Sequence, residues 1–153
     1  MALDQFKRIL ARPVKTSNLV LLRVAFGLIM FWEVIRYFLE GWVFELYRND
    51  QFHFKYQWFQ WVDPLPQPWM TMVFVVMGLT SLMIALGCYF RMASVVFFIV
   101  YLYTFLIDKS YYNNHFYLIA ILSFLLMISP LHRSISLDTY RGSVPHEDFF
   151  AAF

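Results

Sequence analysis

Apolar residues gather in four long runs, separated by stretches that hold most of the polar side chains. The runs extend over residues 18–39, 68–90, 92–107 and 112–131. A membrane-spanning helix needs about 20 mainly apolar residues, with about 17 to 25 as the usual range. The first, second and fourth runs reach this length, and the third is short. We interpret the third run as a span, with a re-entrant segment as the alternative.

This pattern predicts an all-α integral membrane protein, a helical bundle of about four transmembrane helices. We expect residues 1–138 to form the membrane domain and residues 139–153 to form a short polar tail. The few residues at 87–91 between the second and third runs predict a tight helical hairpin. The connection at 40–67 is long and rich in aromatic residues, so we expect an outer loop that forms a cap on the membrane interface.

The composition supports a membrane protein and excludes several other classes. Hydrophobic residues make up 61% of the chain and charged residues 14%, whereas about a quarter of the residues of a soluble domain are charged. The net charge is only +2 and no basic stripe is present, which argues against a nucleic-acid partner. Membrane lipid is the expected partner. The single cysteine, Cys88, excludes an intrachain disulfide and leaves the redox compartment undetermined.

Basic residues accumulate in cytoplasmic connections of membrane proteins. With four spans, the two termini and the 87–91 turn share one side and carry seven lysines and arginines, whereas the other side carries three. The count predicts a multi-pass protein with both termini in the cytoplasm. The connection between the third and fourth runs then lies on the outer or lumenal side.

A polar stretch at 105–118 lies where a membrane tolerates few polar groups. On a continuous helix, Tyr101, Phe105 and Lys109 would share a face, because they recur every four residues. An amine beside aromatic rings loses hydration, which favours its neutral form, and a neutral amine can act as a general base. Lys109 is therefore the candidate catalytic base, with Asp108 and Tyr101 as candidate substrate-binding residues. The alternative is a lysine that faces solvent or snorkels to the interface.

Asn113, Asn114 and His115 begin the fourth run. Helix capping explains one asparagine, because its side chain accepts from unpaired amides at a helix start. Capping hardly explains both asparagines, and it gives no role to His115. We therefore consider His115 a second catalytic candidate and both asparagines candidate substrate-binding residues. No second ligand has helical spacing to His115, so we expect no metal site.

Three charged residues lie inside the first run. Glu33 and Arg36 are three residues apart and are expected to pair on one helix face, which lowers the cost of holding them in a bilayer; a substrate contact is the alternative. Arg23 is expected to snorkel to the cytoplasmic interface. In the outer connection, His53 is a further candidate substrate-binding residue at the mouth of the bundle, with an ordinary loop position as the alternative.

The stretch LIDKSYYNNHFYL at residues 106–118 resembles a segment of the vitamin K-dependent gamma-glutamyl carboxylases and their bacterial relatives. This group is named for the horizontally transferred transmembrane (HTTM) domain. The resemblance covers nearly the whole chain, and the Asp-Lys…Asn-Asn-His pattern is its most specific part. Further matching stretches are RVAFG at 23–27, PLP at 64–66, LGCYFR at 86–91 and SLD at 136–138.

In these carboxylases, oxygenation of reduced vitamin K to its epoxide produces a strong base. That base removes a proton from the gamma carbon of a peptide glutamate, to which carbon dioxide adds. The resemblance assigns the deprotonation of the hydroquinone to Lys109, and the positioning of the quinone oxygen or the lysine to His115 and Asn114. It implies reduced vitamin K or another naphthoquinol as cofactor, oxygen and carbon dioxide as co-substrates, and a glutamate-containing peptide as partner.

Family members continue beyond this length, with further membrane segments and, in animal carboxylases, a large lumenal domain. We therefore expect the chain to correspond to the N-terminal membrane part, a truncated or fragment form completed by a C-terminal part or a partner chain. The predicted function is that of a gamma-carboxylase-like protein of the bacterial inner membrane or the endoplasmic reticulum. The alternative is a non-enzymatic membrane module that binds quinone or lipid, or serves as an assembly partner.

Overall fold

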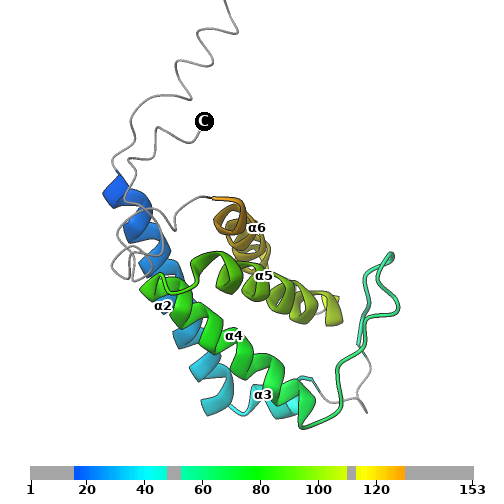
Figure 1. Ribbon diagram of the computed structural model, residues 1–153. Helices are drawn as coiled ribbons and strands as arrows, with labels where there is room; N and C mark the ends of the chain where they lie inside the picture. Colours follow the sequence, from blue (N-terminus) through cyan, green and yellow to red (C-terminus); the bar gives the residue numbers. More distant parts are fainter. Residues whose placement is uncertain (1–15, 48–52, 110–112, 130–153) are drawn as a thin grey trace, which may run out of the picture.

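The computed structural model describes residues 16–47, 53–109 and 113–129, and all the regular secondary structure in these residues is helical. This confirms the all-α class. Among the described helices, α2 packs on α4, α4 on α5 and α5 on α6, while the short α3 contacts α2 and α4 (Figure 1). The helices are α2 (Thr16–Leu39), α3 (Trp42–Glu45), α4 (Trp69–Leu86), α5 (Phe90–Ile107) and α6 (Asn114–Ile128).

Three of these helices, α2, α4 and α5, are long and apolar enough to cross a membrane. The third predicted span is longer than expected, because α5 begins at Phe90 and has 18 residues. The fourth is shorter than expected, because α6 has 15 residues. At about 1.5 Å per residue, α6 covers about 22 Å of a hydrocarbon core that is about 30 Å thick. The polar tail predicted at 139–153 lies outside the described residues.

The turn between α4 and α5 confirms the predicted helical hairpin. Gly87 ends α4 in the left-handed region, at φ 67°, which a residue without Cβ adopts at little cost. The N–H of Gly87 donates to the carbonyl of Ile84 and that of Cys88 to the carbonyl of Met83, a Schellman pattern. The span predicted to run to residue 90 therefore ends four residues earlier, since the sequence motif for a helix stop lies inside the apolar run.

Small residues bring α2 and α4 into close contact. A Cβ at Gly27 would lie 2.6 Å from the carbonyl oxygen of Ser81 and from the amide nitrogen of Ala85. A Cβ at Gly78 would lie 3.2 Å from Cγ1 of Val34. Such contacts let helix backbones approach closely, which is how helices associate in a membrane. Gly27 and Gly78 on facing helices therefore allow α2 and α4 to pack closely.

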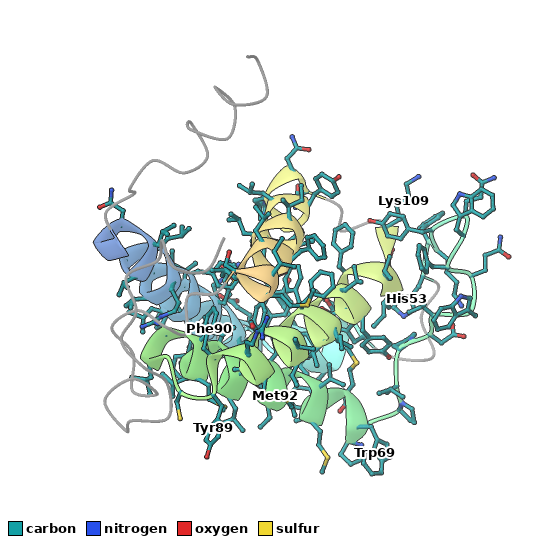
Figure 2. The ribbon with its side chains drawn as sticks, turned by 45° about the horizontal axis from the view of Figure 1, so that its top comes forward. His53, Trp69, Tyr89, Phe90, Met92 and Lys109 are labelled. Carbon is teal, nitrogen blue, oxygen red and sulfur yellow. The ribbon has the colours of Figure 1, made fainter. Side chains whose placement is uncertain are left out.

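Arg23 does not snorkel to the interface as predicted. It is only 2% exposed, and its guanidinium carbon lies 5.8 Å from the ring centroid of Phe90. Figure 2 shows Phe90 among the helices and Tyr89 pointing away from them. The prediction was wrong because the aromatic partner comes from another helix, more than sixty residues along the chain. A cation over an aromatic face is stabilised where water is scarce.

Buried hydroxyl groups on α4, α5 and α6 form hydrogen bonds within their own helices. Each donates to a backbone carbonyl three or four residues earlier, which satisfies the hydroxyl without a partner on a neighbouring helix. The side chains in this group are Thr80, Ser81, Ser94, Thr104 and Ser123. These five hydroxyl groups therefore do not link one described helix to another.

Candidate functional site

A cavity of about 470 Å³ lies at the end of the bundle where α2 ends and α6 begins. Ligand sites typically enclose about 300 to 1,000 Å³, so this cavity can hold a small molecule. Two smaller hollows of about 60 and 50 Å³ adjoin it, since they share Tyr37 and Phe116 with its lining. The main cavity is lined by Arg36, Tyr37, Trp42, Leu46, Asn113, His115 and Phe116.

The predicted pairing of Glu33 with Arg36 is confirmed. Nε and Nη2 of Arg36 donate to the same carboxylate oxygen, Oε2 of Glu33, at 3.0 and 2.7 Å. The guanidinium carbon also lies 5.1 Å from the ring centroid of Trp42. Arg36 therefore lies between a carboxylate and an aromatic face, and it reaches the main cavity. Glu33 lines the 60 Å³ hollow beside it.

Two of the residues at the start of α6 face the main cavity. His115 lies in the linings of both the main cavity and the 60 Å³ hollow, with its ring 4.4 Å from that of Phe116. Asn113 lines the main cavity and is the N-cap of α6, but its side chain makes no capping hydrogen bond. Its backbone carbonyl accepts from the N–H of Phe116 at 3.0 Å. The side chains of Asn113, Asn114 and His115 are all exposed, and Asn114 contributes to none of the three linings.

Tyr101 connects α5 to α6. Its hydroxyl donates to the backbone carbonyl of Phe116 at 3.0 Å, and its ring stacks on Phe97 with centroids 5.9 Å apart. Tyr101 is buried and lines both smaller hollows. This geometry fixes the first turn of α6, and with it the position of His115.

Asp108 and His53, two predicted site residues, meet at the end of α5. Nδ1 of His53 lies 3.1 Å from Oδ2 of Asp108, and both side chains are largely buried. The N–H of Phe54 donates to Oδ1 of Asp108 at 3.3 Å, and the N–H of Lys109 donates to the carbonyl of Phe54 at 2.6 Å. The segment that begins at His53 is therefore fastened to the end of α5, beside the 50 Å³ hollow that Asp108 lines.

The model of one protein family, described as the HTTM domain, matches residues 11–151. The chain belongs to the HTTM domain family. This domain is associated with vitamin K-dependent carboxylase-like membrane proteins. Together with three helices long enough to span a bilayer, it shows that this HTTM domain is a membrane protein. No solved structure matches the chain. The predicted cytoplasmic location of both termini stays a prediction.

Lys109 of the HTTM domain lies outside the helix in which the sequence placed it. Helix α5 ends at Ile107, and Asp108 is extended at φ −140° and ψ 121°. Lys109 therefore does not continue the face of Tyr101 and Phe105, and the prediction of a shared helix face was wrong. Its side chain is exposed and lies outside the linings of the three hollows. Figure 2 shows it pointing away from the helices, near His53. Its catalytic role stays a prediction.

The sequence analysis gave Arg36 a substrate contact only as the alternative to its pairing with Glu33, and it did not name four other lining residues of the HTTM domain's cavity, Tyr37, Trp42, Leu46 and Phe116. The charge of Arg36 inside an apolar run was a usable signal, because a charged side chain at membrane depth is costly and often marks a site. The aromatic residues carried no such signal, since 22% of the chain is aromatic.

Proposed function

We propose that this HTTM domain binds a reduced naphthoquinone in the 470 Å³ cavity, as the quinol-binding part of a vitamin K-dependent carboxylase-like membrane protein. The observation that carries the proposal is the cavity's combination of aromatic walls with a few converging polar side chains. Apolar pockets with a small number of placed polar groups are typical of cofactor sites. By the count of basic residues, we place this end of the bundle on the outer side.

The lining fits the two parts of a naphthoquinol. Tyr37, Trp42 and Phe116 offer ring surface for a fused aromatic system, which prefers offset-stacked or edge-to-face contacts. Arg36 and His115 offer polar atoms for its oxygens. When bound, a reduced naphthoquinone supplies the reducing equivalents for reaction with oxygen. Tyr101 holds the α6 turn that carries His115, through its bond to the carbonyl of Phe116.

Lys109 is the proposed base of a complete reaction, with Nζ as the atom that accepts a hydroxyl proton. Its backbone N–H bond to Phe54 and its neighbour Asp108, which lines the adjoining hollow, support this placement. Oxygen, carbon dioxide and a glutamate-containing peptide belong to the proposal as co-substrates and partner. The outward direction of the Lys109 side chain favours a second candidate, a membrane module that binds quinol without reacting it.

The test uses the purified chain in lipid nanodiscs, titrated with menadiol under nitrogen while tryptophan fluorescence is recorded. We expect saturable quenching that Trp42→Phe reduces. Asn113→Ala and Asn114→Ala are a matched pair, because only Asn113 lines the cavity. Asn113→Ala should weaken binding by about threefold or more, corresponding to a hydrogen bond worth about 0.5–1.5 kcal/mol, and Asn114→Ala should match the parent. Absence of saturable quenching would refute the proposal.

Admission of air then separates the two candidate functions. If Lys109 is the base, Lys109→Met should bind menadiol like the parent but lose the protein-dependent change in its ultraviolet spectrum. Equal oxidation rates for the parent, Lys109→Met and Lys109→Arg would remove the catalytic role and leave the binding module.

A further inference from the structure

The carboxylate of Glu33 has one oxygen available to a ligand. Oε2 accepts both donors of Arg36, whereas Oε1 has no hydrogen-bond partner among the described residues. Glu33 lines the 60 Å³ hollow, which shares Tyr37, His115 and Phe116 with the main cavity. The hollow is therefore an inner extension of the cavity, and the carboxylate belongs to its wall.

The carboxylate of Glu33 can accept a hydrogen bond from a ligand but cannot donate one. An ionised carboxylate accepts hydrogen bonds and donates none. A hydroxyl group reaching the hollow would satisfy Oε1, whereas a carbonyl oxygen in the same place would face another acceptor. The side chain of Glu33 is 32% exposed, but it lies on a helix long and apolar enough to cross a membrane, where water that could pair with Oε1 is scarce. A ligand that leaves this acceptor unpaired therefore loses binding free energy.

The other polar groups of the cavity do not have this property. Arg36 retains donors beyond the two bound by Glu33, and a guanidinium can donate to a hydroxyl oxygen or a carbonyl oxygen. The imidazole of His115 can donate or accept, depending on its tautomer. Either ligand could satisfy both residues, so neither separates a hydroxyl-bearing ligand from its oxidised form.

We propose that Glu33 is the specificity-determining residue of this cavity and selects a ligand with a hydroxyl donor over the same ring system bearing only carbonyl acceptors. The inference rests on the proposed quinol-binding function and deepens it. The Glu33–Arg36 pair has two functions, since it makes both charges tolerable in a membrane helix and presents an acceptor to the ligand. The site accordingly retains the reduced form and releases the oxidised form.

The experiment compares menadiol with menadione, which share a ring system and differ in donor content. Both are titrated under nitrogen against the purified chain in nanodiscs. The parent should bind menadiol more tightly, by on the order of ten- to a hundredfold, the equivalent of a hydrogen bond to a charged group. In Glu33→Gln, whose amide can both donate and accept, the ratio should fall to within about threefold of unity.

Two further variants keep the result interpretable. Glu45→Gln is the matched control, because Glu45 is exposed on α3 and lines none of the three hollows, so the parent's ratio should persist. Glu33→Gln leaves Arg36 without its carboxylate, so the double variant Glu33→Gln/Arg36→Met, which removes both charges, repeats the comparison. Circular dichroism of each preparation checks that the helices form.

The outcomes separate the two proposals. Equal affinity of the parent for menadiol and menadione overturns the role of Glu33 and leaves quinol binding intact. An unchanged preference in folded Glu33→Gln or in the double variant also overturns it. If neither compound binds the parent, the proposed function itself fails. A preference that is lost with Glu33 and kept in Glu45→Gln supports both.

Discussion

Replacing Gly27 by alanine should destabilise the bundle, although alanine normally favours a helix. The added Cβ would lie 2.6 Å from two backbone atoms of α4, the Ser81 oxygen and the Ala85 nitrogen, and 2.8 Å from the Ala85 Cβ. Ordinary Cβ contacts begin at 3.4 Å, so α2 and α4 must separate by about 0.8 Å along that direction. Backbone atoms of a helix cannot yield individually, so the displacement affects the whole interface.

The magnitude follows from two opposing effects. Overpacking costs about 1–3 kcal/mol, and the gain in helix propensity from glycine to alanine returns at most about 1 kcal/mol. Because both 2.6 Å contacts are to backbone atoms, we take the upper part of the overpacking range, about 2–3 kcal/mol, and expect a net loss of about 1–2 kcal/mol in unfolding free energy, or about five- to thirtyfold in the folding equilibrium.

Gly78→Ala is the matched control on the same interface. Its Cβ would lie 3.2 Å from Cγ1 of Val34, with Cβ of Val34 and Cδ2 of Phe31 at 3.8 and 4.0 Å, so only one side-chain methyl group has to shift, by a few tenths of an ångström. We expect its stability to lie within about 0.5 kcal/mol of the parent. The assay is unfolding by sodium dodecyl sulfate in mixed micelles, followed by circular dichroism. Parent-like stability of Gly27→Ala, or a larger loss in Gly78→Ala, would contradict this account of the α2–α4 contact.

Two further predictions concern the site end. Tyr101→Phe should lower the free energy of unfolding by about 0.5–1.5 kcal/mol, because the Phe116 carbonyl loses the hydroxyl that donates to it. Amide hydrogen exchange should become faster in the first turn of α6 but not in α4. Asp108→Asn should weaken the contacts to His53 and Phe54, so limited proteolysis should cleave the 53–63 segment faster. An unchanged cleavage rate would show that other contacts hold this segment.

The sequence predicted the helical elements well because apolar length sets them. The errors occurred where a local signal competed with the apolar run. Gly87 ends α4 although apolar residues continue to Phe90, and a left-handed glycine is a stronger determinant of a helix end than hydrophobicity. The burial of Arg23 could not be predicted, because its aromatic partner Phe90 comes from a helix distant in sequence.

The sequence predicted several residues of the site but not the contacts between them. His53 and Asp108 were both named, but they are 55 positions apart in the sequence, so their contact could not be predicted before the segment around His53 was placed against α5. Helical spacing predicted the wrong position for Lys109, because α5 ends before it. Asp108 has an extended backbone, and its carboxylate accepts a hydrogen bond from Phe54. Helical periodicity predicts which face a residue lies on only if the helix extends to that residue.

The hydrogen bonds of the buried serine and threonine side chains stay within single helices. Sliding α4 along α2 would therefore break none of these bonds, and would be resisted by the close backbone contact at Gly27 and by the rings of Tyr37 and Phe38 against Phe74. At the site end of the bundle, in contrast, hydrogen bonds join separate elements. Tyr101 links α5 to α6, and Asp108 links the end of α5 to Phe54. A bilayer that thins or thickens would thus shift α2 against α4 more readily than it would separate α5 from α6, and the first turn of α6, which carries His115, would stay attached to Tyr101.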